Sequence, residues 1–84
     1  MYVLMQLNRD CEGDNKGFLC GVFNSLDEAR GAMLIEYNTL IEEEERYYED
    51  VDGEIGDWTA IINGQFTTFT LAILDEMLNR SVEF

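Results

Sequence analysis

Residues 18–40 read FLCGVFNSLDEARGAMLIEYNTL, and this stretch decides the fold. Its first six residues are apolar or small, a composition that predicts a β-strand. Ser25 followed by Glu28 has the spacing of a capping box, in which each residue satisfies a backbone N–H at the start of a helix. From Leu26 onward, apolar residues recur every three or four positions, which is the period of one helical face. The stretch therefore predicts a strand that leads directly into a long helix.

The predicted helix has one apolar face that can cover a sheet. Ile35 falls on the opposite side, which we expect to be exposed to solvent, and Gly31 weakens the helix by up to about 1 kcal/mol relative to alanine. We expect the helix to end near residues 46–48. Its apolar face consists of Leu26, Ala29, Met33, Tyr37 and Leu40, with Leu34 and Ile41 on the flank.

Two strands are predicted before the helix. Residues 2–7 (YVLMQL) are apolar on both alternating faces, as in an interior strand. Residues 9–17 are polar and contain glycine, so they predict a loop. The strand at 18–23 then pairs antiparallel with the first.

The chain after the helix predicts a hairpin. Residues 49–57 are acidic and contain glycine, so they predict a loop, and residues 58–62 and 65–70 predict two strands. Asn63-Gly64 between them favours a type I′ turn, because both residues tolerate positive φ. Residues 71–79 can extend the last strand or form a short helix, and the spacing of their leucines favours the helix.

The order ββαββ(α) predicts an α+β protein, a mostly antiparallel sheet with one long helix packed on one face. With 84 residues and 9.7 kDa, the chain is expected to form a single domain over residues 1–84. An apolar content of 46% is enough for one hydrophobic core.

The charge is unusual. There are 18 Asp and Glu residues against 5 Lys and Arg, which gives a net charge of −13. Such a chain is not expected to bind nucleic acid or an anionic membrane directly, because both need cationic side chains.

The chain lacks histidine, which excludes a Ser-His or Cys-His nucleophile pair and an imidazole metal ligand. We therefore expect no enzymatic activity, no cofactor and no metal. Cys11 and Cys20 could form one disulfide, but the N-terminus does not resemble a signal peptide. Reduced thiols in a cytoplasmic protein are the favoured interpretation.

Acid is concentrated in one part of the chain, residues 36–57, which we call the acidic segment. Only Arg46 opposes its ten carboxylates. They belong to Glu36, Glu42, Glu43, Glu44, Glu45, Glu49, Asp50, Asp52, Glu54 and Asp57.

Without a specific function, the acidic segment would be a solvated surface that aids solubility. However, residues 42–45 lie near the C-terminal end of the predicted helix, where the macrodipole disfavours an anion by about 0.3–1 kcal/mol. A locally unfavourable cluster suggests a use for the charge itself. Carboxylates along such a helix would partly imitate nucleic-acid phosphates.

For two further patterns we favour a purely structural interpretation. Asp50, Asp52 and Gly53 resemble the middle of an EF-hand calcium loop, but the frame places Tyr48 and Thr59 where carboxylates are needed. Tyr47 and Tyr48 anchor the helix end to the sheet in one interpretation. In the other, one ring is exposed and stacks on an arginine of a partner.

The opening strand at residues 1–7 and the junction GVFNSLDEA at residues 21–29 resemble those of many small phage and bacterial proteins. In size and charge the chain is similar to phage-encoded inhibitors, among them anti-CRISPR proteins and DNA mimics that block nucleases. The resemblance implies a stoichiometric binder that occupies a nucleic-acid site on a bacterial defence protein. It carries no functional residue with it.

Two hypotheses follow. The first is a non-enzymatic inhibitor in the bacterial cytoplasm, which binds the basic groove of a defence nuclease such as a CRISPR–Cas effector. The second is a small adaptor that uses sheet edges or Ile35 to form a homodimer or join an assembly, with acid that only confers solubility. The residues expected to bind the partner in the first hypothesis are Glu36, Glu42, Glu43, Glu45, Tyr48, Glu49, Asp50, Asp52, Glu54 and Asp57.

Overall fold

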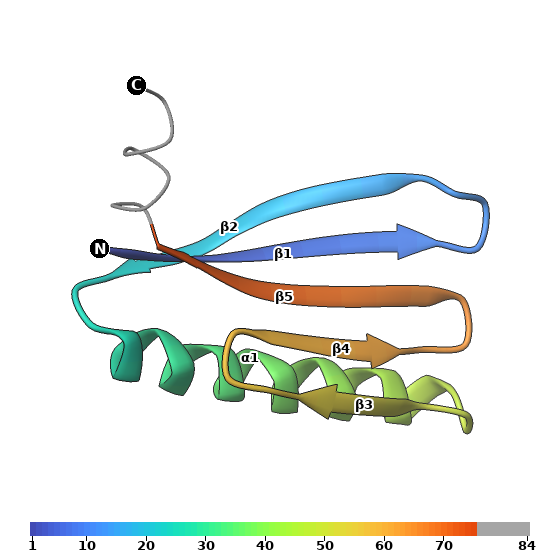
Figure 1. Cartoon of the computed structure of the whole chain (residues 1–84). Helices are drawn as coiled ribbons and strands as arrows, with labels where there is room; N and C mark the ends of the chain where they lie inside the picture. Colours follow the sequence, from blue (N-terminus) through green and yellow to red (C-terminus); the bar gives the residue numbers. More distant parts are fainter. Residues whose placement is uncertain (76–84) are drawn as a thin grey trace.

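A computed structural model describes residues 1–75 of the chain. It contains one helix of 22 residues packed on one face of a five-stranded antiparallel sheet, with strand order β2-β1-β5-β4-β3 (Figure 1). The predicted α+β class is confirmed. The elements are β1 (Tyr2–Asp10), β2 (Asn15–Phe23), α1 (Leu26–Tyr47), β3 (Asp52–Ile55), β4 (Thr59–Asn63) and β5 (Thr67–Asp75).

The β1–β2 hairpin is longer than the sequence predicted. Its strands reach Asp10 and restart at Asn15, so most of the expected loop at residues 9–17 is strand. The Asp10 side chain accepts hydrogen bonds from the backbone N–H groups of Glu12 and Asp14, at 2.9 and 3.0 Å. Gly13 adopts φ of 92°, a conformation that other residues rarely take. These contacts close the hairpin in four residues.

Helix α1 begins and ends where the sequence predicted. The Ser25 hydroxyl accepts a hydrogen bond from the Glu28 N–H at 3.2 Å, and the helix ends at Tyr47. The face predicted to be apolar packs on the sheet, and Ile35 on the opposite side is 68% exposed, as expected. The core consists of Leu4, Ala29, Met33, Leu40, Ala60, Ile62, Leu71 and Ile73.

The expected loop at residues 49–57 contains a short edge strand, β3, which the sequence analysis missed. All four of its residues are exposed, so it lacks the alternation of a half-buried strand. Gly53 lies against the helix: a Cβ there would come within 2.7 Å of the Tyr37 hydroxyl oxygen. Close approach of the tyrosine therefore requires glycine at this position.

The β4–β5 hairpin is confirmed, but two details differ from prediction. Neither Asn63 nor Gly64 has a positive φ, so the turn is not type I′; the Gly64 N–H instead donates to the Thr67 carbonyl at 2.9 Å. The helix favoured for residues 71–79 is wrong for 71–75, which continue β5 beside β1. Leu71 and Ile73 alternate into the core there, and residues 76–79 lie outside the described part.

Candidate protein-binding surfaces

The ten carboxylates of the acidic segment are mostly in contact with water. Eight are on exposed residues, and only Glu36 and Glu44 are half-buried. Within the described residues, the structure records no ion pair for any of them. Residues 1–75 therefore leave this charge unneutralised and available to a partner.

The fold divides these carboxylates among several surfaces. At about 100° per residue, Glu36 and Glu43 lie on the flank of α1 that faces β2. Glu42 and Glu45 point away from the sheet, and the loop after the helix adds Glu49 and Asp50. We call these six residues the acidic ridge.

Three other carboxylates of the predicted binding set lie outside the ridge, although one of them, Asp52, lines a pocket together with Glu49 and Asp50. Asp52 and Glu54 pair with Asn63 and Ile61 in the sheet, so their side chains share the sheet face that points away from α1. Asp57 lies in the β3–β4 turn beside Arg30, whose Nε donates to the Asp57 carbonyl at 2.9 Å. The sequence grouped these residues by position along the chain, and strand alternation separates them in space.

Glu44, which is left out of the predicted binding set, differs from its neighbours. Its carboxylate approaches the β4–β5 turn: a Cβ on Gly64 would lie 2.5 Å from Glu44 Oε1. Partial burial raises the pKa of Glu44, and the adjacent charge of Glu43 raises it further. A carboxylate in this setting disfavours ionisation and is not part of the acidic ridge.

A groove of about 520 Å³ runs between α1 and β2 beside the acidic ridge. Phe18, Leu40 and Phe69 supply apolar walls, and Glu36 and Glu43 stand at the helix side. The sequence analysis did not find this groove, because its walls come from three distant segments. An aliphatic side chain with a cationic end matches this combination of walls and charges.

Cys20 lines the same groove and is a free thiol, as is Cys11. An irregularity in the β1–β2 register near Cys20 turns its Sγ toward Gln6 Oε1, at 3.8 Å. Burial raises the pKa of the Cys20 thiol, and the negative charge of Glu36 raises it further. The group is therefore a neutral thiol near pH 7.

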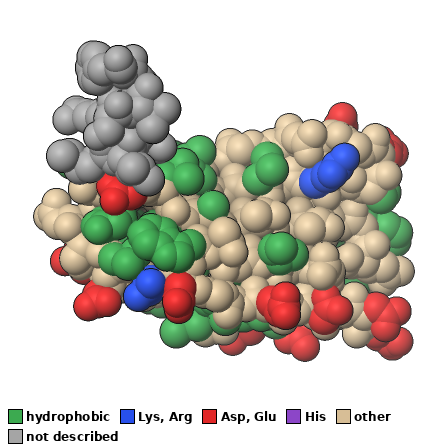
Figure 2. Space-filling model, in the orientation of Figure 1, with side chains coloured by type: hydrophobic (Ala, Val, Ile, Leu, Met, Phe, Trp, Pro, Cys, Tyr) green, Lys and Arg blue, Asp and Glu red, His purple; other side chains and the backbone are tan. Residues whose placement is uncertain are grey.

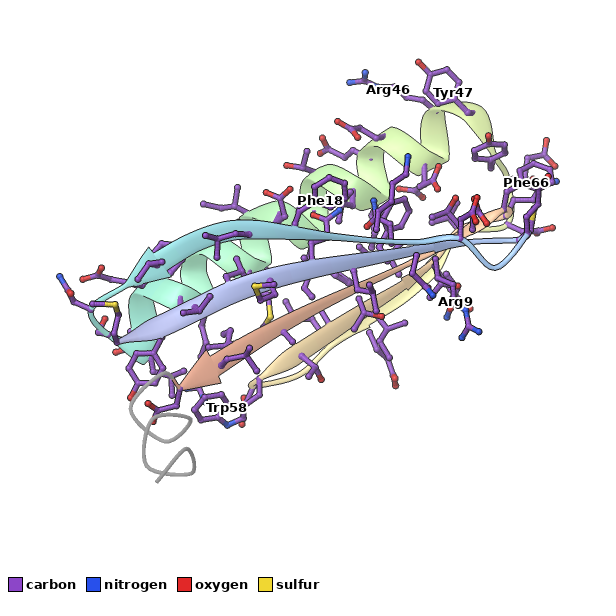
Figure 3. All side chains as sticks on the ribbon, turned by 90° about the horizontal axis from the view of Figure 1, so that it is seen from above. Arg9, Phe18, Arg46, Tyr47, Trp58 and Phe66 are labelled. Carbon is purple, nitrogen blue, oxygen red and sulfur yellow. The ribbon has the colours of Figure 1, made fainter. Side chains whose placement is uncertain are left out.

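The two tyrosines at the end of α1 have different surroundings. Tyr48 is half-buried and packs edge-on against Phe66, with ring centroids 5.3 Å apart. Tyr47 is 76% exposed and, with Arg46, projects from the outer end of the helix (Figure 3). Tyr48 thus anchors the helix end, and Tyr47 is the ring that a partner can reach.

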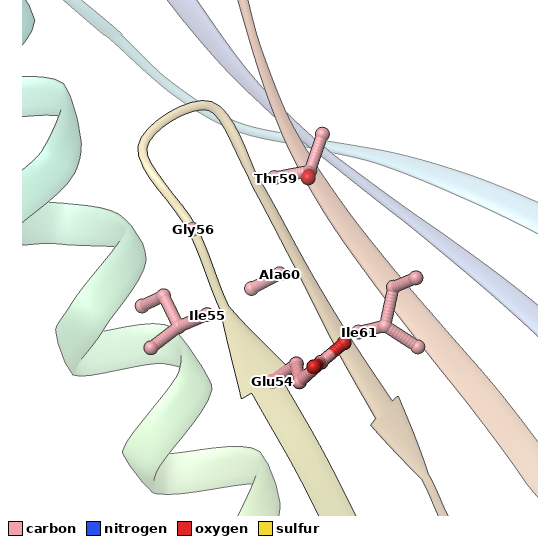
Figure 4. Close-up of a pocket in the computed structure, with 6 residues that line it drawn as sticks. All are labelled: Glu54, Ile55, Gly56, Thr59, Ala60 and Ile61. Carbon is pink, nitrogen blue, oxygen red and sulfur yellow. The ribbon is translucent and has the colours of Figure 1, made fainter.

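A shallow pocket of about 280 Å³ lies against β3 and β4 (Figure 4). Glu54 is the only titratable side chain among the six that line it, which are Glu54, Ile55, Gly56, Thr59, Ala60 and Ile61. The pocket therefore offers no second acid or base that could act with Glu54.

Within residues 1–75, no three His, Cys, Asp or Glu side chains are grouped so that they could hold a metal ion. Over the same residues, no helix has the length and apolar character needed to cross a membrane.

The sheet face opposite α1, which we call the open face, carries apolar side chains that the described residues leave uncovered. Asp and Glu side chains gather along the lower margin of this face, while its centre carries apolar and uncharged groups (Figure 2). The most exposed apolar side chains of this face, 40–63% exposed, are Leu7, Leu19, Val22, Ile61 and Leu74.

No protein-family model, no curated protein and no solved structure matches this chain.

Proposed function

We propose that this protein is a non-enzymatic inhibitor that uses the acidic ridge to occupy the basic, nucleic-acid-binding groove of a bacterial defence nuclease, such as a CRISPR–Cas effector. The observation that carries the proposal is the group of mostly exposed carboxylates on α1 and the following loop, for which the structure records no ion pair among residues 1–75. The proposed site of action is the cytoplasm of the bacterial host.

The spacing of the ridge supports partial mimicry of nucleic acid. Glu42 and Glu45 are three positions apart in α1, so a helical rise of about 1.5 Å per residue separates their charges by about 4.5 Å along the axis. One strand of DNA carries a charge about every 3.4 Å of axis. The helical pair Glu42 and Glu45 therefore places two charges at a spacing of the same order as that of phosphates along one strand.

The groove beside the ridge adds selectivity for a protein partner. Arginine or lysine side chains that normally contact phosphates have aliphatic stems, which can lie against Phe18 and Phe69. Their charged ends then reach Glu36 and Glu43, at the helix side of the groove. Because free cations have no aliphatic stem, only the side chains of a protein can make both the apolar and the charged contacts.

The first experiment identifies the partner. The tagged 84-residue chain is used to capture proteins from bacterial lysate at about 50 mM and 500 mM salt. Because the expected contacts are electrostatic, capture should be stronger at low salt, and the captured protein should bind nucleic acid. Nucleic acid and the inhibitor must then exclude each other on that protein; a stable ternary complex would contradict the proposal.

Matched variants test the ridge itself. The ridge variant, Glu42→Gln with Glu43→Gln and Glu45→Gln, changes the net charge from −13 to −10. The control variant removes three exposed carboxylates elsewhere, by Glu12→Gln, Asp27→Asn and Glu28→Gln, and has the same net charge. The ridge variant should bind the captured protein at least tenfold more weakly, chiefly through slower association, while the control binds nearly as the parent does. Equal binding by both variants would favour the adaptor hypothesis instead.

A further inference from the structure

The open face has the composition of an interface. Antiparallel sheets with one solvated face normally place polar side chains there. Here Leu7 and Ile61 occupy the same cross-strand row on either side of Thr70, and both are at least 40% exposed. Val22, Val3 and Leu74 form a second row across β2, β1 and β5 that is apolar throughout. Contiguous exposed apolar surface is typical of a site of protein association.

The size of the open face suits association of two such sheets. Each strand residue covers about 16 Å², from a strand spacing of about 4.8 Å and a rise of about 3.3 Å. Strands of nine, nine, nine, five and four residues therefore give roughly 500–600 Å² of flat area. Protruding side chains enlarge the accessible area toward the roughly 800 Å² per partner of a stable interface.

The charge distribution favours a second copy of this chain as the partner of the open face. The chain carries −13 in total, but among the described residues the open face holds only Arg9, Asp52 and Glu54 as charged groups, a local balance of −1. Arg9 lies on the side of the sheet away from α1, whereas Phe18 lies toward it (Figure 3). Two copies can therefore approach through this face with their acidic ridges pointing outward in opposite directions.

The face is also complementary to itself. Arg9, Thr68, Asn63 and Asp52 form one cross-strand row, with Arg9 on β1 and Asp52 on β3, on opposite sides of β5. A two-fold axis parallel to β5 would place each Arg9 over Asn63 of the second copy and next to its Asp52. The same axis places each Leu7 over Ile61 of the second copy.

We propose that the open face binds a second copy of this chain, in a two-fold face-to-face sandwich centred on β5. Leu7 and Ile61 form its apolar contacts, and Arg9 pairs with Asp52 of the second copy. This proposal goes beyond the inhibitor function and does not depend on it. The resulting particle carries one acidic ridge on each outer side.

The mass of the 84-residue chain in solution tests the proposal. Sedimentation equilibrium from about 1 to 200 µM should show a transition from 9.7 kDa to twice that mass. Because two chains of −13 repel each other, raising salt from about 50 to 500 mM should strengthen the dimer. A chain that stays monomeric at 200 µM in high salt overturns the proposal. Nuclear Overhauser contacts from residues 76–84 to Leu7 would then identify the chain's own end as the cover.

Substitutions test which face is used. Leu7→Thr with Ile61→Thr keeps side chains suited to strands but removes the apolar contact, and the dimer dissociation constant should rise at least thirtyfold. Ile35→Thr, on the outer side of α1, is the control and should leave that constant unchanged. If Ile35→Thr weakens the dimer and the double variant does not, the interface lies on the outer side of α1 and the proposal is overturned. Circular dichroism establishes that each variant is folded.

A charge exchange tests the register. Arg9→Asp alone brings an acid next to Asp52 of the second copy, and Asp52→Arg alone brings two arginines together, so each should weaken the dimer fivefold or more. The double variant restores opposite charges and should recover most of the affinity. Failure of the double variant to recover, with both single variants weakened, overturns the proposed two-fold arrangement.

Discussion

The ridge variant, Glu42→Gln with Glu43→Gln and Glu45→Gln, should make the fold more stable while it weakens target binding. The helix ends at Tyr47, so Glu45 lies in the last turn and Glu43 at its border. Removing an anion from this position gains about 0.3–1 kcal/mol, an effect that fades beyond the last turn. Glu42 contributes little through the dipole because it lies farther from the helix end.

Side-chain pairs add smaller contributions. Glu42 and Glu45 are three positions apart and repel by about 0.2–0.5 kcal/mol, while adjacent carboxylates do not face each other. Loss of Glu43 also removes its repulsion of the Glu44 carboxylate, which helps to raise the pKa of Glu44. Against this, Glu42 loses a favourable spacing to Arg46 of similar size. The expected net gain is about 0.5–1.5 kcal/mol at low salt, since these side chains are exposed and screened by water.

Thermal unfolding followed by circular dichroism measures the gain. For a domain of this size, about 4–8 °C per kcal/mol gives a rise in Tm of about 2–12 °C. The rise should nearly vanish at about 1 M salt, where the Debye length falls to roughly 3 Å. The control variant loses Asp27 and Glu28 from the first turn of α1, where anions are favourable, and should be less stable than the parent. A less stable ridge variant, or a gain that persists at 1 M salt, would refute this account of the charges.

Three other substitutions have defined outcomes. Burial and the charge of Glu43 raise the pKa of Glu44 in the folded protein, so ionisation of Glu44 lowers the stability of the fold above that pKa. Glu44→Gln should therefore raise Tm at pH 7. The difference should disappear below about pH 4, where Glu44 is protonated in both the folded and the unfolded protein. Gly53→Ala should cost about 1–3 kcal/mol by crowding the Tyr37 hydroxyl, and urea titration should find a smaller cost in a Tyr37→Phe background. Glu36→Gln should lower the raised pKa of the Cys20 thiol and so speed its modification by a disulfide reagent at pH 8, measured for this residue by peptide mass spectrometry. An unchanged rate would contradict the influence of the Glu36 charge on Cys20.

Long regular patterns made most of the fold predictable. The three- and four-residue spacing from Leu26 to Leu40 specified both the helix and its buried face, and Ser25 marked its start. In contrast, β3 has four exposed residues and no local pattern. It forms because β4 pairs with it and because Gly53 admits the Tyr37 ring, and neither contact is visible in the segment itself.

The end of β5 shows how tertiary contacts override local spacing. Leu71, Leu74 and Leu78 fit a helix, but Leu71 and Ile73 also alternate, and the described residues use that alternation to fill the core beside β1. The candidate site was limited in the same way. Residues of the acidic ridge on α1 could be grouped as members of one helix, whereas the sequence could not show that β3 places Asp52 and Glu54 on the sheet face that points away from α1.

The separation of charge from apolar surface gives the two proposals opposite dependence on salt. The acidic ridge lies on the helix layer and the loop that follows it, and its attraction to a basic groove weakens as salt screens it. The open face carries almost no net charge, so salt acts on it chiefly by reducing repulsion between two acidic chains and strengthens the dimer. A single salt titration that follows target binding and chain mass together can therefore separate the two surfaces. If both interactions weaken in parallel, one charged surface serves both, and the division of the molecule into an acidic layer and an apolar layer does not explain its associations.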